Sequence, residues 1–529
     1  MSRILMVSAE AAPFAKTGGL ADVVGALPKA LVELGEEVGV VLPRYGAVTL
    51  TEPAPAGMTP AVVTSSADIS MPRSADSPGA GRGDVQGGGV ATTMGKNWTG
   101  AERIWHEMPI TLGHYSFTAS IDEIRREGVR FFFVDCPPLF ARDGIYNERG
   151  VDYADNPLRF ALLNQAALGI ARHIFRPQIF HCHDWPASLL APYLKETFAG
   201  DPTFFNTRCV LTIHNLGYQG NFPPTILEDL GLDRNLFQPE GLEFWGQVSF
   251  LKAGIVWADA ITTVSPTYAR EIQTEEYGYG FDGVLRPRAE KICGILNGVD
   301  YSEWDPRTDR HIAARYSDED LEGKRFCKLA LQGEMGLPVD QDRPLFGIVS
   351  RLAHQKGFDL LESVAPMLLK ENVAMVVLGQ GDPQIEAMFQ TLARAFPEQV
   401  AVRTGYSEGL SHRIEAGTDM FLMPSRYEPC GLNQMYSLRY GTVPVVRATG
   451  GLADTVEPST GFRFAPYTPE ALYGATRDAL EAWRNPAAWQ KRMKTGMRKD
   501  FSWRSSAAEY QRLYRRLLES GQARVIHRV

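Results

Sequence analysis

The stretch from 419 to 458 contains the densest set of residues able to take part in chemistry. These residues are Glu428, Cys430, Gly431, Gly450 and Gly451. Apolar runs at 420–423 and 443–446 are typical of buried strands, and residues with helical spacing follow each run, so a parallel β-α-β-α unit is predicted. Ligands of such units bind beyond the carboxyl ends of the strands, and free N–H groups at a helix start suit phosphate. A glycine pair alone more often marks a tight turn.

Two other strand-to-helix turns carry cations. Arg351 and Lys356 are five residues apart, where both can face one anion while the helix dipole contributes. Near the N-terminus, Lys16 precedes Gly18 and Gly19, which offer backbone N–H groups at a helix start. This first turn is not a G-x-G-x-x-G fingerprint, which weakens a dinucleotide-binding interpretation.

Polar residues end two neighbouring predicted strands, at Asp184 and at His214. A lone histidine at a strand end is more often structural, but two such turns side by side form a cleft wall. The run His181-Cys182-His183 resembles a metal site only superficially, because successive strand residues point to opposite faces. The D-x-D runs at 318–320 and 340–342 do not follow strands. No metal is therefore expected.

The elements that position these residues alternate between strand and helix along most of the chain, which predicts an α/β protein. Helical patterns are expected at 21–34, interrupted by Pro28, at 156–175 as an amphipathic helix, and at 241–258. A final amphipathic helix is expected at 501–518. The composition from 51 to 100 is rich in Pro, Gly, Ser and Thr and predicts a mobile surface excursion, with order returning at 129.

Composition sets broad limits on function. The 529 residues suit two large α/β domains, and a net charge of -8 argues against general affinity for nucleic acid. Six scattered cysteines without C-x-x-C spacing suit a reducing cytosol. The N-terminus has no signal-like segment and no apolar run approaches 18 residues, so we expect a cytoplasmic protein without a membrane partner.

Nine motifs occur in order along the chain: K-T-G-G-L-A-D-V, H-C-H-D-W, T-I-H-N-L-G-Y-Q-G, L-K-A-G, A-D-A-I-T-T-V-S-P-T-Y-A-R-E-I, L-N-G-V-D, S-R-L-A-H-Q-K-G, P-S-R-Y-E-P-C-G-L-N-Q and T-G-G-L-A-D-T-V. Together they resemble bacterial glycogen synthase and plant starch synthase over nearly the whole chain, except at 51–125, where an insertion is expected. The resemblance implies the GT-B architecture, in which two Rossmann-like doubly wound domains face a deep cleft. The expected domains are 1–292, with a low-complexity excursion near 51–125, then 293–498, and a C-terminal helix at 499–529 that crosses back to the first domain.

The same resemblance implies a retaining hexosyltransferase that moves glucose from ADP-glucose to the non-reducing 4-hydroxyl of an α-1,4-glucan, without metal or cofactor. It assigns glucose binding to His214, Asn297, Glu428, Cys430 and Gly431. Asp184 is placed near the reacting face and Tyr406 on adenine, with Trp185 and Tyr146 as weaker acceptor candidates. The diphosphate is expected to meet Arg351, Lys356 and Lys16, together with the amides near Gly18, Gly19, Gly450 and Gly451.

Several alternatives remain open from the sequence. Related GT-B families place a second Glu eight residues after the first, whereas position 436 is Tyr, as in the glycogen synthases. Rival functions are a UDP-glucose-dependent synthase of the sucrose or trehalose type, a glucan phosphorylase with pyridoxal phosphate, and a non-catalytic glucan-binding protein. Retention could proceed through a covalent glucosyl-enzyme or by front-side attack, with front-side attack favoured by the family pattern.

Overall fold

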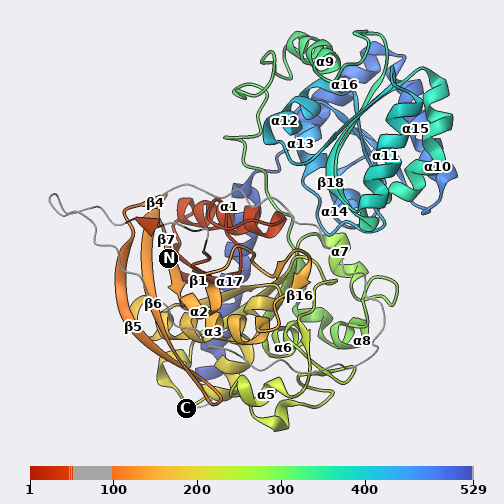
Figure 1. The fold of residues 1–529 in the computed structure, drawn as a ribbon. Coiled ribbons are helices and arrows are strands. Elements are labelled where there is room, and N and C mark those ends of the chain that lie inside the picture. The colour runs from red at the N-terminus through yellow and green to blue at the C-terminus, as the bar shows by residue number, and fades with distance from the viewer. Residues whose placement is uncertain (47, 49, 52–97, 527–529) are drawn as a thin grey trace, which may run out of the picture.

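The computed structural model describes residues 1–529 except 47, 49, 52–97 and 527–529. Two β-sheets built mainly of parallel strands, each covered by helices, form the two halves of the molecule (Figure 1). Most of the surface excursion expected at 51–100 lies outside the described residues.

The first half is built on a nine-stranded sheet with the order β16-β15-β11-β10-β1-β2-β7-β6-β5. Its parallel strands are β1 (Arg3–Val7), β2 (Glu37–Pro43), β7 (Val129–Asp135), β10 (Ile179–His183), β11 (Arg208–Ile213), β15 (Ala260–Thr263) and β16 (Ile292–Gly294). Leu5 of β1 lies between Phe180 and Gly39 in register, and these strands are buried on both faces. Apolar runs bounded by turn residues therefore predicted the central strands well.

The antiparallel edge of this sheet corrects one expectation. β5 (Glu102–Leu112) and β6 (Tyr115–Arg126) form a hairpin whose second strand pairs with β7. We expected order to return only at 129 and an insertion to extend through 125, which is wrong for residues 102–126. Exposed and buried side chains mix along β5, so its apolar signal is weak, as is usual for a strand with one solvated face.

The second half contains a six-stranded, all-parallel sheet with the order β19-β18-β17-β20-β21-β22. The strands are β17 (Leu345–Leu352), β18 (Ala374–Gly381), β19 (Val400–Thr404), β20 (Met420–Met423), β21 (Val443–Arg447) and β22 (Phe462–Phe464). Helices α10 (Phe358–Leu368), α11 (Pro383–Ala395), α12 (Glu408–Gly417), α13 (Asn433–Arg439), α15 (Pro469–Trp483) and α16 (Pro486–Met497) belong to this half (Figure 1). The alternation of strand and helix is the one that the sequence predicted.

Three helices differ from their predicted form. α1 (Gly19–Glu33) continues through Pro28 without interruption. α3 (Asn156–Ile170) is buried on nearly all sides rather than amphipathic, and a π-helical turn extends it to 175. The helix expected at 241–258 is only α6 (Phe250–Trp257), because the preceding residues form a small sheet of β12 (Asn221–Phe222), β13 (Glu243–Phe244) and β14 (Gln247–Ser249).

The C-terminal helix α17 (Trp503–Ile526) follows the second half but packs into the first (Figure 1). Its Tyr510 and Tyr514 are fully buried in the core of the nine-stranded sheet, and the helix also lies against α1. Tyr514 Oη is 2.8 Å from His181 Nδ1 on β10. The predicted crossing back of the last helix is confirmed.

Two short helices join the halves by capping each other. The carboxylate of Asp454 in α14 (Gly450–Thr455) accepts from Thr267 N, at 2.7 Å, near the start of α7 (Pro266–Glu271). In return, the carboxylate of Glu271 at the end of α7 accepts from Gly450 N at 3.0 Å. Each carboxylate thus meets the positive end of the other helix, which fixes the two halves relative to each other at this point.

Candidate active site

The first wall of the candidate site lies where β10 and β11 end side by side. Asp184 follows β10 with φ +55° and ψ -172°, a conformation that non-glycine residues rarely adopt. Its carboxylate Oδ1 accepts the backbone N–H of His214 at 2.7 Å. The His183 ring at the end of β10 lies 3.0 Å from the His214 ring, between Nδ1 and Nε2. The structure therefore brings together the two predicted residues and adds His183.

Burial disfavours charge on this wall. Desolvation raises the pKa of Asp184 to about 7, although backbone N–H groups of His214 and Asn215 oppose the shift. Desolvation also lowers the pKa of His214 to about 3, and it lowers that of His183 well below its usual value. Both histidines are therefore neutral at pH 7.

The second wall is ionic. Lys356 Nζ lies 2.7 Å from Glu428 Oε2, and Ser425 Oγ donates to the same oxygen at 3.0 Å. Lys356 reaches this position from the turn after β17, where Gly357 has φ +73° and any Cβ would lie 2.0 Å from the Pro424 carbonyl oxygen. Glycine is therefore required to bring this turn against the strand end that leads to Glu428.

Arg351, near the end of β17, is exposed. Among the described residues its guanidinium has no carboxylate partner, and no contact joins it to Lys356. It is thus available to an incoming anion, whereas Lys356 is already paired.

Several contacts join the two walls. The Asn215 side chain, beside His214, hydrogen-bonds to Tyr427, the neighbour of Glu428. The backbone N–H of Asn297 donates to the thiol of Cys430, and burial raises the pKa of that thiol to about 12. The Asn297 side-chain oxygen is buried without a partner among the described residues. The predicted glucose-binding residues are thus gathered at one place, and Cys430 is a neutral thiol.

The glycines of the second half serve close packing. Gly450 has φ +44°, and a Cβ there would lie 1.9 Å from the Glu428 carbonyl oxygen; a Cβ at Gly451 would lie 2.0 Å from that of Cys430. Gly451 N donates to the Glu428 carbonyl oxygen and Gly450 N to Glu271, so neither amide is free in this structure. Gly431, with φ +71°, packs against Gln434. The expected phosphate cradle of free amides is therefore absent at these two glycines.

The N-terminal turn is organised by a residue that the sequence analysis missed. Glu10 is buried and accepts from Thr17 N at 2.6 Å, from Gly18 N at 3.3 Å and from Tyr146 Oη at 2.8 Å. Glu10 lies three residues beyond the end of β1, whereas Asp184 follows β10 directly, so position at a strand end gave no clear signal for Glu10. Gly18 is thus engaged, whereas Gly19 is exposed with open space around it.

Lys16 lies 2.5 Å from Asp22, and this turn approaches Tyr406 of the second half. Burial opposes the charged form of Lys16, but Asp22, Tyr406 and Glu408 outweigh it and raise its pKa. Tyr406 is 59% exposed, so its side chain is accessible to a stacking partner.

Trp185 packs among other aromatic rings, with its centroid 4.8 Å from that of Phe160 and 6.1 Å from that of Tyr146. A Cβ at Gly220 would lie 2.4 Å from the Trp185 ring. This environment is that of a core residue with one accessible side, which suits support of an acceptor better than direct recognition.

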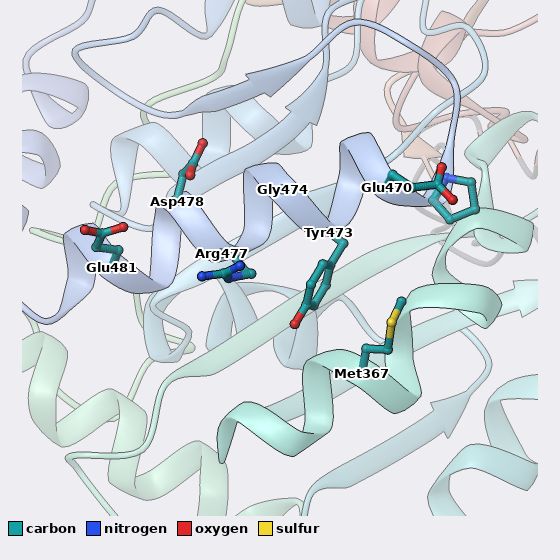
Figure 2. A pocket seen from close by; sticks show the side chains of 8 residues that line it. Met367, Glu470, Tyr473, Gly474, Arg477, Asp478 and Glu481 are labelled. Atoms are coloured by element: carbon teal, nitrogen blue, oxygen red, sulfur yellow. The ribbon is translucent and has the colours of Figure 1, made fainter.

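Two surface hollows among the described residues contain none of the predicted residues. One lies between α10 and α15, bordered by Met367 and Tyr473 with Arg477 and Glu481 along the same helix (Figure 2). It is open to solvent, and its charged residues, Glu470, Arg477, Asp478 and Glu481, all come from α15, so it lacks the enclosed apolar lining of a typical ligand site.

Within the described residues, no three His, Cys, Asp or Glu side chains are grouped to hold a metal ion. His181 Nε2 lies 2.6 Å from Thr212 Oγ1 and its other nitrogen meets Tyr514, so the H-C-H run is not a ligand set. A search of the helices in the same residues finds none with the length and apolarity to cross a bilayer.

Comparisons with known proteins agree with this architecture. The starch synthase catalytic domain family matches residues 3–70 and 90–287, and the family of glycosyl transferases group 1 matches 336–496. The chain region without a family match in the first half is thus 71–89, narrower than the 51–125 expected. A glycogen synthase of Anaeromyxobacter dehalogenans (strain 2CP-C) is 48% identical over 97% of this chain and 99% of its own length.

A glycogen synthase of Koribacter versatilis (strain Ellin345) is 46% identical over 97% of both chains. The catalytic domain of starch synthase IV from Arabidopsis thaliana, solved with ADP and acarbose, superposes with a TM-score of 0.81 at 30% identity, covering 98% of this chain and 99% of that one. Sucrose-phosphate synthase from Thermosynechococcus elongatus, at 17% identity and a TM-score of 0.56, shares the fold alone.

The two Rossmann-like sheets and the two family matches define a GT-B glycosyltransferase. Identity over nearly the full length is high with several relatives. The chain belongs to the family of glycogen and starch synthases, which are hexosyltransferases.

Proposed function

We propose that the protein transfers glucose from ADP-glucose to the non-reducing 4-hydroxyl of an α-1,4-glucan, with retention of configuration. The observation that carries this proposal is the partly buried Lys356–Glu428 pair in the turn after β17, together with Arg351 near the end of the same strand, whose guanidinium has no carboxylate partner among the described residues. Such a wall can bind an anionic leaving group, and the histidines of the opposite wall are neutral at pH 7.

The choice of ADP-glucose rests on family membership and on Tyr406. The Arabidopsis relative was solved with ADP bound, together with acarbose. In this chain the exposed Tyr406 ring, near Lys16, offers a stacking surface for adenine beside a cation for phosphate. The unpartnered, buried side-chain oxygen of Asn297 would accept from a sugar hydroxyl, which removes the cost of leaving it unsatisfied.

The reaction breaks the bond between glucose C1 and the diphosphate. Negative charge then develops on the diphosphate and positive charge on the sugar ring, so catalysis depends on placement and on charge stabilisation. Lys356 and Arg351 would stabilise the departing diphosphate. The neutral ring of His214 would hold the sugar without placing a second positive charge beside the sugar ring, which becomes positive in the reaction.

We infer front-side attack rather than a covalent intermediate. A double displacement needs an unengaged carboxylate under C1. Glu428 Oε2 is committed to Lys356 and Ser425, and Asp184 accepts a backbone N–H while burial raises its pKa to about 7. Neither carboxylate is a strong nucleophile in this state. In this mechanism the leaving phosphate accepts the proton of the acceptor hydroxyl.

We also propose that the protein works in the cytoplasm and that its domains are 1–292, 293–498 and 499–529, as expected from the sequence. β16 (Ile292–Gly294) pairs within the sheet of the first half, so a limit just after Gly294 fits the strand pairing better than one at 292, and α17 itself begins at Trp503.

The test is nucleotide release with glycogen as acceptor and ADP-glucose or UDP-glucose as donor. ADP release that depends on glycogen supports the proposal. UDP release alone would instead favour a sucrose- or trehalose-type synthase, and release of neither nucleotide, with glycogen binding intact, would favour a glucan-binding protein.

A further inference from the structure

His183 is the one member of the first wall to which neither the sequence analysis nor the proposed reaction assigns a task. It is fully buried at the end of β10, and the only hydrogen bond of its side chain within the described residues joins Nδ1 to His214 Nε2 at 3.0 Å. The other ring nitrogen, Nε2, is buried without any partner. A buried polar atom without a partner costs stability, so its presence requires an explanation.

Two proton arrangements can make this bond. Both rings are neutral at pH 7, so each carries one N–H. If His214 donates from Nε2, then His183 holds its proton on the buried Nε2, as an N–H with no acceptor. If His183 donates from Nδ1, then its Nε2 is a bare lone pair, and the proton of His214 is on Nδ1.

The second arrangement is the better one. Buried N–H groups without an acceptor are rarer in proteins than under-satisfied acceptors, so the lone pair is the less costly atom to leave unpaired at His183 Nε2. His214 itself is only partly buried, and its Nδ1 has no partner among the described residues. This nitrogen is therefore free to meet a ligand.

We propose that His183 is a positioning residue that fixes His214 in the tautomer with its proton on Nδ1, as a hydrogen-bond donor to an oxygen of the donor sugar. The inference rests on the proposed function for the identity of the sugar, but the tautomer itself is a property of the free protein. Without His183, His214 could adopt either tautomer, and one of them cannot donate from Nδ1.

Neighbouring groups hold the His183 ring in place. The His181 ring lies 4.2 Å from it, centroid to centroid, and is itself held by Thr212 and by Tyr514 of α17. His181 touches neither Asp184 nor His214 through a hydrogen bond. It therefore shares the burial of His183 without sharing its proposed task, which makes it the matched control.

The first experiment is ¹⁵N NMR of the histidine rings in the intact protein without ligand, with His214 assigned by His214→Gln. We expect the Nδ1-protonated tautomer at His214. The Nε2-protonated tautomer, or an averaged signal, would overturn the proposal whatever the substrate proves to be.

The second experiment compares His183→Asn with His183→Leu. The side chains are similar in shape, but only the Asn amide can donate from the position of Nδ1. In the ADP-glucose assay we expect kcat/KM to fall roughly 10-fold in the Leu variant and to stay within about threefold of the parent in the Asn variant, because a hydrogen bond of this kind contributes on the order of one decade.

His181→Asn should leave kcat/KM within about twofold of the parent at a temperature where the protein is folded, while lowering its melting temperature.

Equal kcat/KM in the Leu and Asn variants of His183 would show a merely structural role and overturn the proposal. If the Leu variant does not fold, the NMR measurement of the His214 tautomer in the parent protein tests the proposal by itself. If no sugar nucleotide is turned over by the parent protein, the proposed function fails while the tautomer measurement still tests the role of His183.

Discussion

The two walls of the candidate site manage charge in opposite ways. On the first wall, burial disfavours charge: it raises the pKa of Asp184 to about 7, and it keeps His183 and His214 neutral at pH 7. On the second wall, charge is kept and paired, between Lys356 and Glu428, with Arg351 unpaired beside them. The difference shows how one site can serve both ends of a breaking glycosidic bond. Cations stand only where negative charge would develop, and no cationic histidine lies where the sugar would become positive.

The largest effect is expected from removing the second wall's charge. One unit charge at about 4 Å and an effective dielectric near 20 contributes roughly 4 kcal/mol, part of which water restores in a truncated site. Lys356→Ala should therefore lower kcat by roughly 30- to 1000-fold with a smaller effect on the KM of ADP-glucose. Steady-state kinetics on the folded variant measures this.

Arg351→Ala should behave alike, and the double variant should fall short of additivity because both cations act on one anion. Lys370→Ala, an exposed lysine in the same half, is the control and should leave kcat within about twofold. A near-normal kcat in Lys356→Ala would limit this lysine to packing against Glu428.

Removing the ionisable group of the first wall should raise stability and lower activity. The folded pKa of Asp184 is about 7, above its unfolded value, so the folded state binds the extra proton. Stability from this group is therefore present below about pH 4 and is lost as pH rises toward 7. At pH 8, Asp184→Asn should thus be more stable than the parent by about 2–3 kcal/mol, since relaxation reduces the full shift.

Urea unfolding at pH 4.5 and pH 8 measures the effect as a difference between variant and parent, which cancels other titrating groups. The amide oxygen of Asn can still accept from His214 N, so the turn should be preserved. A variant that is less stable than the parent at pH 8 would show that Asp184 is ionised and satisfied in the folded state.

A comparison of the two walls also shows what the sequence could predict. Lys356, Glu428, Asp184 and His214 follow apolar strands, and the rule that parallel strands end at one edge sufficed to gather them. The free amide expected at Gly450 is instead hydrogen-bonded to Glu271, which belongs to a helix of the other half. Such long-range pairing leaves no local pattern.

His183 and Glu10 were missed for a related reason. Each looks structural by itself, and only tertiary neighbours reveal an unpaired nitrogen or a capped turn. The hairpin of β5 and β6 escaped prediction because one face is solvated and its apolar residues are dispersed. The buried parallel strands, which concentrate apolar residues, were predicted closely.

A smaller effect is expected from loosening the contact that holds the walls at a fixed separation. Each of the reciprocal caps contributes about 1 kcal/mol, the usual value for a helix cap. Glu271→Ala and Asp454→Ala should each raise the KM of ADP-glucose by up to about fivefold with little change in kcat. X-ray scattering should show a broader distribution of separations between the halves.

Glu275→Ala, an exposed neighbour of the same segment, is the control. If both cap variants keep the kinetics and scattering profile of the parent, the caps do not set the distance between the walls.

The smallest effect should come from chelation. The diphosphate is expected to be neutralised by Lys356, Arg351 and Lys16, so EDTA should change the rate of ADP release by less than about twofold. A loss of activity that magnesium or manganese restores would contradict this and would show that the cations of the second wall are insufficient.

The course of α17 has a consequence for how the polypeptide is made. Tyr510 and Tyr514 complete the core under the nine-stranded sheet, yet they are synthesised more than 200 positions after β16, the last strand of that sheet. At about 5–20 residues per second, the ribosome needs roughly 10–40 s to produce them. During this interval the nascent first half lacks two residues of its core, so that core is completed only after α17 has been synthesised.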